Sequence, residues 1–214
     1  MPKKITIIDS GIGNLFSISR ALETVGAEIE ITSDAKTIAK AQHLILPGVG
    51  AFSTGMSGLH EQELDTAIIE HSQSGKPLLG ICLGMQMLMS SSEEHGNHQG
   101  LNLIPGQVKK IPNRTIEGNT HKIPHIGWNA LQPPSEKRSW KNTILENTIE
   151  GDAIYFVHSF FVTPDSFDDA LAITYYGGHK ISAVVNRGNV YGCQFHPEKS
   201  GKTGLNILKR FVQI

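Results

Sequence analysis

The stretch Leu78-Leu-Gly-Ile-Cys-Leu-Gly-Met-Gln86 decides how the first half of this sequence folds. An apolar run of strand length ends at Cys82, and helical spacing begins at Leu83. Glycines at both flanks of the cysteine permit a tight turn and close approach of neighbouring segments. We therefore predict a buried strand, a sharp turn at Cys82 and a helix directly behind it, which is the setting of a nucleophile elbow.

Strands and helices alternate on the N-terminal side of this stretch. The spacing predicts strands over residues 4–9, 28–32, 42–46 and 78–81. It predicts helices over about 15–25 and 63–74, and a short helix that Ser33 or Asp34 would cap. Strand and helix at this rhythm indicate βαβ units, and thus a parallel sheet with helices on both faces.

The second half of the chain has a different pattern, with strands joined by short turns. The predicted strands cover residues 107–112, 153–162, 170–176, 181–186 and 190–195, and we expect antiparallel hairpins that extend the sheet. A final amphipathic helix is predicted over 200–212, and the proline-containing segment 113–145 is expected to run over the surface. The predicted fold class is α/β, with a single domain over 1–214 built on a doubly wound mixed sheet.

Composition excludes several classes of protein. The chain has 214 residues and a net charge of −1, without a basic stripe interleaved with aromatics, so we expect no nucleic acid partner. Its apolar runs are far shorter than the ~20 residues that span a bilayer, and its first residues lack the apolar region of a signal peptide. Two cysteines and ten scattered histidines predict a cytoplasmic protein with free thiols, no metal site and no cofactor.

Cys82 is the candidate nucleophile. A position at a helix N-terminus favours thiolate over thiol, and the N–H of Leu83 would point towards a developing oxyanion. Free cysteine is also among the most buried residue types, so the alternative is a structural thiol. Cys193, which lies within an expected strand between apolar neighbours, is predicted to be such a core residue.

The candidate base lies near the C-terminus, in Gln194-Phe-His-Pro-Glu198. His196 follows a predicted strand that Pro197 would end. Because Glu198 lies two residues further on, both side chains would point the same way from an extended segment. A carboxylate in that place can hold the imidazole in one tautomer and stabilise the imidazolium, so that His196 can take a proton from Cys82.

Three ordered motifs resemble the signatures of class I (triad-type) glutamine amidotransferases. They are Pro47-Gly-Val-Gly50, Gly80-Ile-Cys-Leu-Gly-Met-Gln86 and Gln194-Phe-His-Pro-Glu198. Four further segments resemble the glutaminase subunit of imidazole glycerol phosphate synthase: Asp9-Ser-Gly-Ile-Gly-Asn14, Pro124-His-Ile-Gly-Trp-Asn129, Tyr155-Phe-Val-His-Ser-Phe160 and His196-Pro-Glu-Lys-Ser-Gly201. The resemblance covers about residues 5–212 and implies a flavodoxin-like core.

The resemblance also implies an activity and a partner. Proteins of this kind hydrolyse L-glutamine to glutamate and ammonia and form a heterodimer with a (β/α)8-barrel cyclase. The ammonia is channelled to the cyclase, which makes imidazole glycerol phosphate and an aminoimidazole carboxamide ribotide in histidine biosynthesis.

Roles for single residues follow from the same resemblance. The catalytic triad would be Cys82, His196 and Glu198. Backbone and side chains that hold the oxyanion or the substrate would belong to Gly48, Val49, Gly50, Leu83, Gln86, His158, Ser159 and Phe160. Residues facing the barrel would be Asp9, Gly11, Asn14 and Lys199. The plainer readings are a simple βα turn at residues 48–50, a solvated helix residue at Gln86 and a core histidine at His158.

Ser10 departs from the family pattern, which has an aromatic residue at this place, close to the expected partner surface. One alternative is therefore a related glutaminase that supplies ammonia to a similar barrel in surface-sugar amidination. Another is a catalytically silent subunit that only binds a barrel. A third is a stand-alone peptidase of the same sheet type, against which Gln86 and the segment 47–50 argue.

Overall fold

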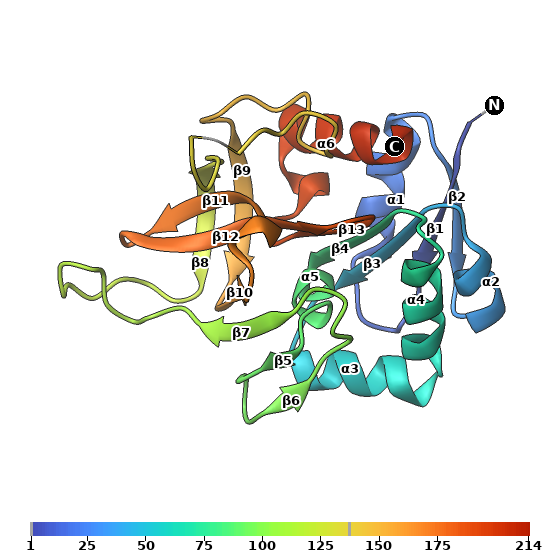
Figure 1. Cartoon of the computed structure of the whole chain (residues 1–214), viewed down its shortest axis with the longest axis horizontal. Coiled ribbons are helices and arrows are strands. Elements are labelled where there is room, and N and C mark those ends of the chain that lie inside the picture. The colour runs from blue at the N-terminus through green and yellow to red at the C-terminus, as the bar shows by residue number, and fades with distance from the viewer. Residues whose placement is uncertain (1, 137) are drawn as a thin grey trace.

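A seven-stranded sheet with the order β11-β12-β13-β4-β3-β1-β2 runs through the molecule (Figure 1). The computed structural model describes residues 2–136 and 138–214. The predicted domain over 1–214 also includes Met1 and Lys137, which lie outside the described residues. The strands are β1 (Lys4–Ile8), β2 (Glu28–Thr32), β3 (Leu44–Gly48), β4 (Leu78–Cys82), β11 (Ala170–Tyr176), β12 (His179–Arg187) and β13 (Val190–Cys193). Neighbours from β13 to β2 pair in parallel, and β11, β12 and β13 pair antiparallel.

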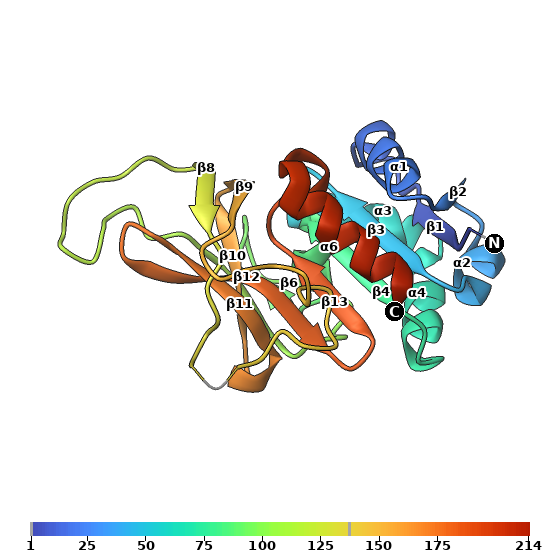
Figure 2. The ribbon, with the colours of Figure 1, turned by 90° about the horizontal axis from the view of Figure 1, so that it is seen from above.

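Helices cover both faces of the sheet (Figures 1 and 2). They are α1 (Leu15–Thr24), α2 (Ala35–Lys40), α3 (Phe52–Glu61), α4 (Leu64–Gln73), α5 (Leu83–Met87) and α6 (Gly201–Gln213). Alternate residues of β3 enter different cores: Ile45 packs with α1 and α6, and Leu44 and Leu46 pack with α3, α4 and α5. Both faces of the central parallel strands β1, β3 and β4 are therefore buried, which confirms the predicted doubly wound α/β fold with an antiparallel extension.

Two smaller sheets lie beside the antiparallel end of the large one (Figure 1). The first has the order β10-β7-β5-β6, and the second pairs β8 with β9. Their strands are β5 (Ser91–Ser92), β6 (His98–Gln99), β7 (Gly106–Lys110), β8 (His125–Ala130), β9 (Ala153–His158) and β10 (Phe160–Pro164). The prediction that residues 107–112 extend the large sheet is wrong, because β7 pairs antiparallel with β10 and parallel with β5.

The strand predicted over residues 153–162 is two strands that belong to different sheets. β9 ends at His158 and pairs with β8, whereas β10 begins at Phe160 and pairs with β7. The break has a local cause: the His158 ring turns back, and its Nδ1 lies 2.8 Å from the Phe160 carbonyl oxygen. An unbroken apolar pattern does not reveal this change of partner strand.

The surface course predicted for residues 113–145 is wrong in two places. β8 lies inside this segment and pairs along its length with β9. Leu131, Ile144 and Leu145 are fully buried in the core that α6 covers. Because prolines and polar residues dominate the segment, its few buried apolar residues do not form a recognisable pattern in the sequence.

Helix α3 has no counterpart among the sequence-based predictions, because glycine and polar residues interrupt its apolar pattern. Gly55 explains one interruption: a Cβ at this position would lie 2.7 Å from Met87 Sδ on α5. Helix α3 therefore packs closely against the helix that follows Cys82. Among the described residues, no helix combines the length and the apolar character needed to cross a membrane.

Candidate active site

Cys82 lies at a sharp turn between β4 and α5, as the sequence predicts. Its backbone has φ 55° and ψ −109°, and the residue is 8% exposed. Two glycines allow helix α5 to lie directly on the strands: a Cβ at Gly84 would overlap the Leu46 carbonyl oxygen, and one at Gly80 would lie 2.7 Å from the Gly84 oxygen. The N–H of Leu83 belongs to the first turn, where backbone donors have no partner inside the helix.

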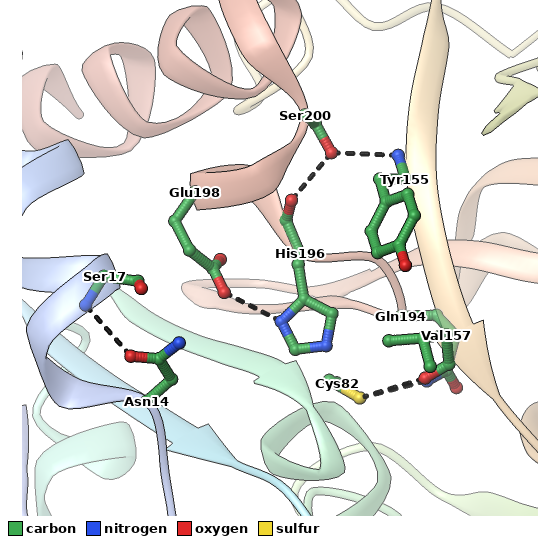
Figure 3. A network of polar contacts seen from close by, with 9 residues as sticks. All are labelled: Asn14, Ser17, Cys82, Tyr155, Val157, Gln194, His196, Glu198 and Ser200. Atoms are coloured by element: carbon green, nitrogen blue, oxygen red, sulfur yellow. Dashed lines mark hydrogen bonds and ion pairs between the residues drawn. The ribbon is translucent and has the colours of Figure 1, made fainter. Parts of the chain in front are cut away.

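His196 meets Glu198 through a turn of 3-10 helix, η2 (Pro197–Lys199), so the extended segment predicted here is wrong. The imidazole Nδ1 lies 2.8 Å from Glu198 Oε1, and the two side chains are 6% and 3% exposed. Ser200 Oγ donates to the His196 carbonyl at 2.7 Å and accepts from the Tyr155 N–H at 3.0 Å, which ties the turn to β9 (Figure 3). The helical turn holds the pair in contact without an extended backbone.

The charge balance around His196 favours the imidazolium. Burial acts against the charged ring, but hydrogen bonds and charges from Cys82 and Glu198 outweigh it and raise the pKa of His196 to about 9. Glu198 Oε2 is buried and has no hydrogen-bond partner among the described residues. Glu198 and Asn14 both line a small cavity of about 10 Å³, about the space that one water occupies.

The Cys82 sulfur has three polar neighbours (Figure 3). His196 is one of them: it lines the same cavity as Cys82, and the nearby sulfur is one of the groups that raise its pKa. The Val157 carbonyl oxygen lies 4.0 Å from Sγ, and the carboxamide Nε2 of Gln194 lies 3.9 Å from it. The sulfur is therefore flanked by a titratable ring, an acceptor and a neutral donor.

A cavity of about 480 Å³ opens above Cys82 and brings most of the predicted site residues together. With Cys82 and His196, its lining includes Asn14, Val49, Gly50, Leu83, Gln86, His158, Ser159, Phe160 and Lys199. Gly48 lines the adjoining small cavity beside Glu198. A larger surface hollow of about 580 Å³ lies between α2 and α4, without either cysteine in its lining.

The residues predicted to face a partner lie in the loop after β1 and in η2. Asp9 Oδ1 accepts from the N–H of Gly11 at 3.0 Å, and Asn14 caps α1 by accepting from the N–H of Ser17 at 3.1 Å. Asp9 and Gly11 do not belong to the lining of the 480 Å³ cavity. Ser10 is only 6% exposed, so its side chain points into the protein and not towards a docking surface.

The sequence-based predictions missed two residues near the sulfur and its cavity. Glu94 lines the cavity, and its Oε2 accepts from the N–H of Phe52 at 2.6 Å, which caps α3. No pattern marks it within the polar stretch 90–98. Gln194 is fully buried, and only its place next to the His-Pro-Glu segment could have drawn attention to it.

A buried histidine pair lies next to the cavity. His125 Nδ1 lies 3.0 Å from His158 Nε2, and His125 Nε2 lies 3.0 Å from Asn129 Oδ1. Burial lowers the pKa of His158 to about 3, against the opposing effect of its hydrogen bond to the Phe160 carbonyl. Both lowered pKa values favour neutral rings at neutral pH, and the His158 ring contacts the Phe160 carbonyl within the segment 158–160. Within residues 2–136 and 138–214, no cluster of three histidine, cysteine, aspartate or glutamate side chains could hold a metal ion.

Comparisons with known proteins agree with this geometry. A family model described as glutamine amidotransferase class-I matches residues 6–214. The imidazole glycerol phosphate synthase subunit HisH 1 of Legionella pneumophila (strain Paris) is 49% identical over 210 residues, covering 98% of this chain and 99% of the relative. The subunit HisH of Geobacillus sp. (strain WCH70) is 48% identical over 212 residues, covering 98% and 96%.

A solved glutamine amidotransferase structure superposes with a TM-score of 0.72 at 16% identity, covering 98% of this chain and 99% of that one, which shows a shared fold. The match to the family model and the full-length relatives settle the family. The chain belongs to the class I glutamine amidotransferases and, within them, to the family of imidazole glycerol phosphate synthase subunits HisH.

Proposed function

We propose that this protein hydrolyses L-glutamine to glutamate and ammonia with Cys82 as nucleophile, His196 as base and Glu198 as the group that orients the base. The observation that carries the proposal is the meeting of three side chains. The turn after β4 presents Cys82 to the cavity, and the turn after β13 presents to the same cavity a buried imidazole that is held by Glu198.

The chemistry follows from these contacts. In the resting site the proton of the thiol lies on His196, as its raised pKa favours, and the thiolate attacks the side-chain amide carbon of glutamine. The N–H of Leu83 and a backbone N–H of the segment 48–50 would hold the oxyanion, and loss of one such donor typically costs about 3–4 kcal/mol. The protonated imidazole then gives its proton to the departing ammonia, and water hydrolyses the thioester.

The cavity suits the amino-acid end of glutamine, which carries both charges. Glu94 supplies a carboxylate for the substrate ammonium group. Gln86 uses its Nε2 within the protein, where it donates to the Phe160 carbonyl at 3.0 Å, and its Oε1 remains for the ligand. Backbone groups of the segment 158–160 can serve the substrate carboxylate.

The ammonia would pass to a (β/α)8-barrel cyclase that makes imidazole glycerol phosphate and an aminoimidazole carboxamide ribotide in histidine biosynthesis. Support comes from the full-length relatives, whose printed names are those of imidazole glycerol phosphate synthase subunits. We propose a heterodimer in the cytoplasm, with the barrel seated on the face that carries Asp9, Gly11, Asn14 and Lys199. Asn14 and Lys199 line the cavity above Cys82, so a partner there would cover the site.

The test is to mix the purified chain with a cyclase subunit and measure glutamate release with and without the cyclase ligand. We expect low release from the chain alone, strong release with the liganded barrel, and none from the Cys82→Ser variant. Full activity without any partner, or none under any condition, would contradict the proposal. If only a barrel from surface-sugar amidination stimulates glutamate release, the proposed glutaminase activity stands and the proposed acceptor of the ammonia is wrong.

A further inference from the structure

Gln194 is a polar side chain next to the candidate nucleophile, and the proposed mechanism gives this side chain no role. It follows β13 directly and is completely buried. Its backbone N–H donates to the Ala183 carbonyl at 2.9 Å, so the peptide continues the sheet beyond the end of the strand. Because water cannot reach the carboxamide, the protein must satisfy its hydrogen-bonding groups.

The orientation of the Gln194 carboxamide is fixed by its neighbours. The Phe160 carbonyl can only accept, so the group of Gln86 that lies 3.0 Å from it must be the NH2. The second hydrogen of that NH2 points to the Gln194 carboxamide at 3.2 Å, which must therefore present its oxygen. The NH2 of Gln194 is thus turned towards Cys82 Sγ, at 3.9 Å.

This side-chain donor and the backbone neighbour of the sulfur have opposite effects on its charge. The Val157 carbonyl, 4.0 Å from Sγ, can accept a hydrogen bond from a thiol and repels a thiolate. The NH2 of Gln194 stabilises negative charge on the sulfur and, being locked by Gln86, needs no reorganisation when the charge develops. A hydrogen bond to a charged group is also stronger than one between neutral groups.

We propose that Gln194 is a hydrogen-bond donor to the reacting sulfur, and that Gln86 is a positioning residue that keeps the Gln194 carboxamide turned towards it. Together they favour the anionic form of Cys82 and hold Sγ in place for attack. The proposal rests on the proposed function in one respect, namely that Cys82 is the nucleophile.

The test measures alkylation of Cys82 by iodoacetamide, with the site of labelling followed by mass spectrometry. The reagent is neutral and reacts with thiolate, and the reaction needs neither glutamine nor a partner. In Gln194→Met, a chain of similar length without a donor, we expect labelling at pH 7 to slow about tenfold and its pH profile to move to higher pH. Labelling of Gln194→Met at the rate of the parent protein would overturn the proposal.

Two further variants separate the donor from the packing. Gln194→Leu, like Gln194→Met, places an apolar side chain here, without the flexibility of methionine, and cannot donate to the sulfur, so labelling should slow at least as much. Gln86→Glu places an oxygen where the NH2 was, which removes the constraint on Gln194 and should also slow labelling. Fast labelling in both variants would exclude the orientation argument.

The matched control is Thr174→Val, which changes another buried polar side chain of the same sheet, on β11. Thr174 is 1% exposed, and its hydroxyl has no hydrogen-bond partner among the described residues. We expect its labelling rate to equal that of the parent. Cys193 serves as an internal check of folding, since it is fully buried and should react only after denaturation.

A measurement on the unmodified sequence covers the case in which the Gln194 variants do not fold. The side-chain amide resonances of Gln194 should move with pH together with the reactivity of Cys82, and this movement should vanish in Cys82→Ala. Amide resonances of Gln194 that show the same pH dependence in the parent and in Cys82→Ala would overturn the proposal. If labelling slows as expected while no glutamate is ever released, the proposed function fails and the role of Gln194 at the sulfur stands.

Discussion

At the scale of single residues, the candidate site depends on a buried contact that a local turn creates. The 3-10 turn at Pro197–Lys199 places Glu198 Oε1 2.8 Å from His196 Nδ1. Both side chains are almost inaccessible to water, so the carboxylate charge acts on the imidazole with little screening. The pair sets both the tautomer and the charge of the ring that faces Cys82.

Glu198→Gln tests this contact, because the amide keeps the shape of the side chain but removes its charge. We expect kcat for glutamate release with the liganded cyclase to fall on the order of 100-fold, while KM for glutamine changes less than twofold. A coupled glutamate assay measures both. The result would be contradicted by an unchanged kcat, or by a loss that appears only in KM.

His158 predicts how stability depends on acid. Burial lowers its pKa in the folded protein to about 3, below the roughly 6.5 of an unfolded chain. The unfolded state therefore binds the proton first as the pH falls. The contribution of the neutral His158 ring to the free energy of unfolding is complete above about pH 6.5. It is lost as the pH falls from there to pH 3, and about 2 kcal/mol of it is lost at pH 5.

Urea unfolding at pH 7 and pH 5 measures this loss directly. The variant His158→Asn should lose less free energy of unfolding between these two values than the parent does. His125 shares the buried pair, and burial lowers its pKa too, so a smaller dependence should remain. An identical pH dependence in parent and variant would assign the effect to other groups.

At the scale of elements, the parallel half of the fold can be predicted from the sequence, because the spacing of its apolar residues and the position of its turn residues indicate the same strands and helices. The strands before Asp9, Gly48 and Cys82 appear where apolar runs predict them. Half-buried elements are harder: α3 is interrupted by glycine, and β9 and β10 are divided at Ser159 by a side-chain contact. The candidate triad came from residue types and order, whereas Gln194 and Glu94 gain their meaning only from contacts across the fold.

Gly84 makes the packing of α5 on the sheet possible, and Gly84→Ala tests it. The new Cβ would overlap the Leu46 carbonyl oxygen on β3, so the helix or the strand must move. We expect the free energy of unfolding to fall by about 3 kcal/mol or more. Gly13→Ala is the control, since its Cβ would meet Pro47 Cγ at an ordinary 3.5 Å; equal Tm values for the two variants would refute the packing argument.

At the scale of the whole molecule, the site follows from strand order. β1, β3, β4 and β13 run parallel, so their carboxyl ends lie at one edge of the sheet. This edge carries the loop with Asn14, the segment 48–50, Cys82 and the turn with His196. Open α/β sheets bind ligands in that place, which is why four segments far apart in sequence share one cavity.

A partner docked over this edge should change the reactivity of Cys82. We expect a glutamine-analogue electrophile to label Cys82 slowly in the isolated chain and faster with the liganded cyclase, because docking would arrange the segment 48–50 around the oxyanion. Val49 is 44% exposed in the isolated chain, so its surroundings are free to change on docking. Equal labelling rates with and without the partner would argue against this coupling.

The backbone of Cys82 has a consequence for the history of such chains. A residue with a side chain is disfavoured at φ 55° and ψ −109°, by about 1–3 kcal/mol, and glycine is the residue that relieves this cost. Cys82→Gly should therefore raise Tm while abolishing glutamate release, so folding and catalysis select opposite residues at one position. In a lineage that kept the chain only as a binding subunit, drift towards glycine at position 82 would be favoured.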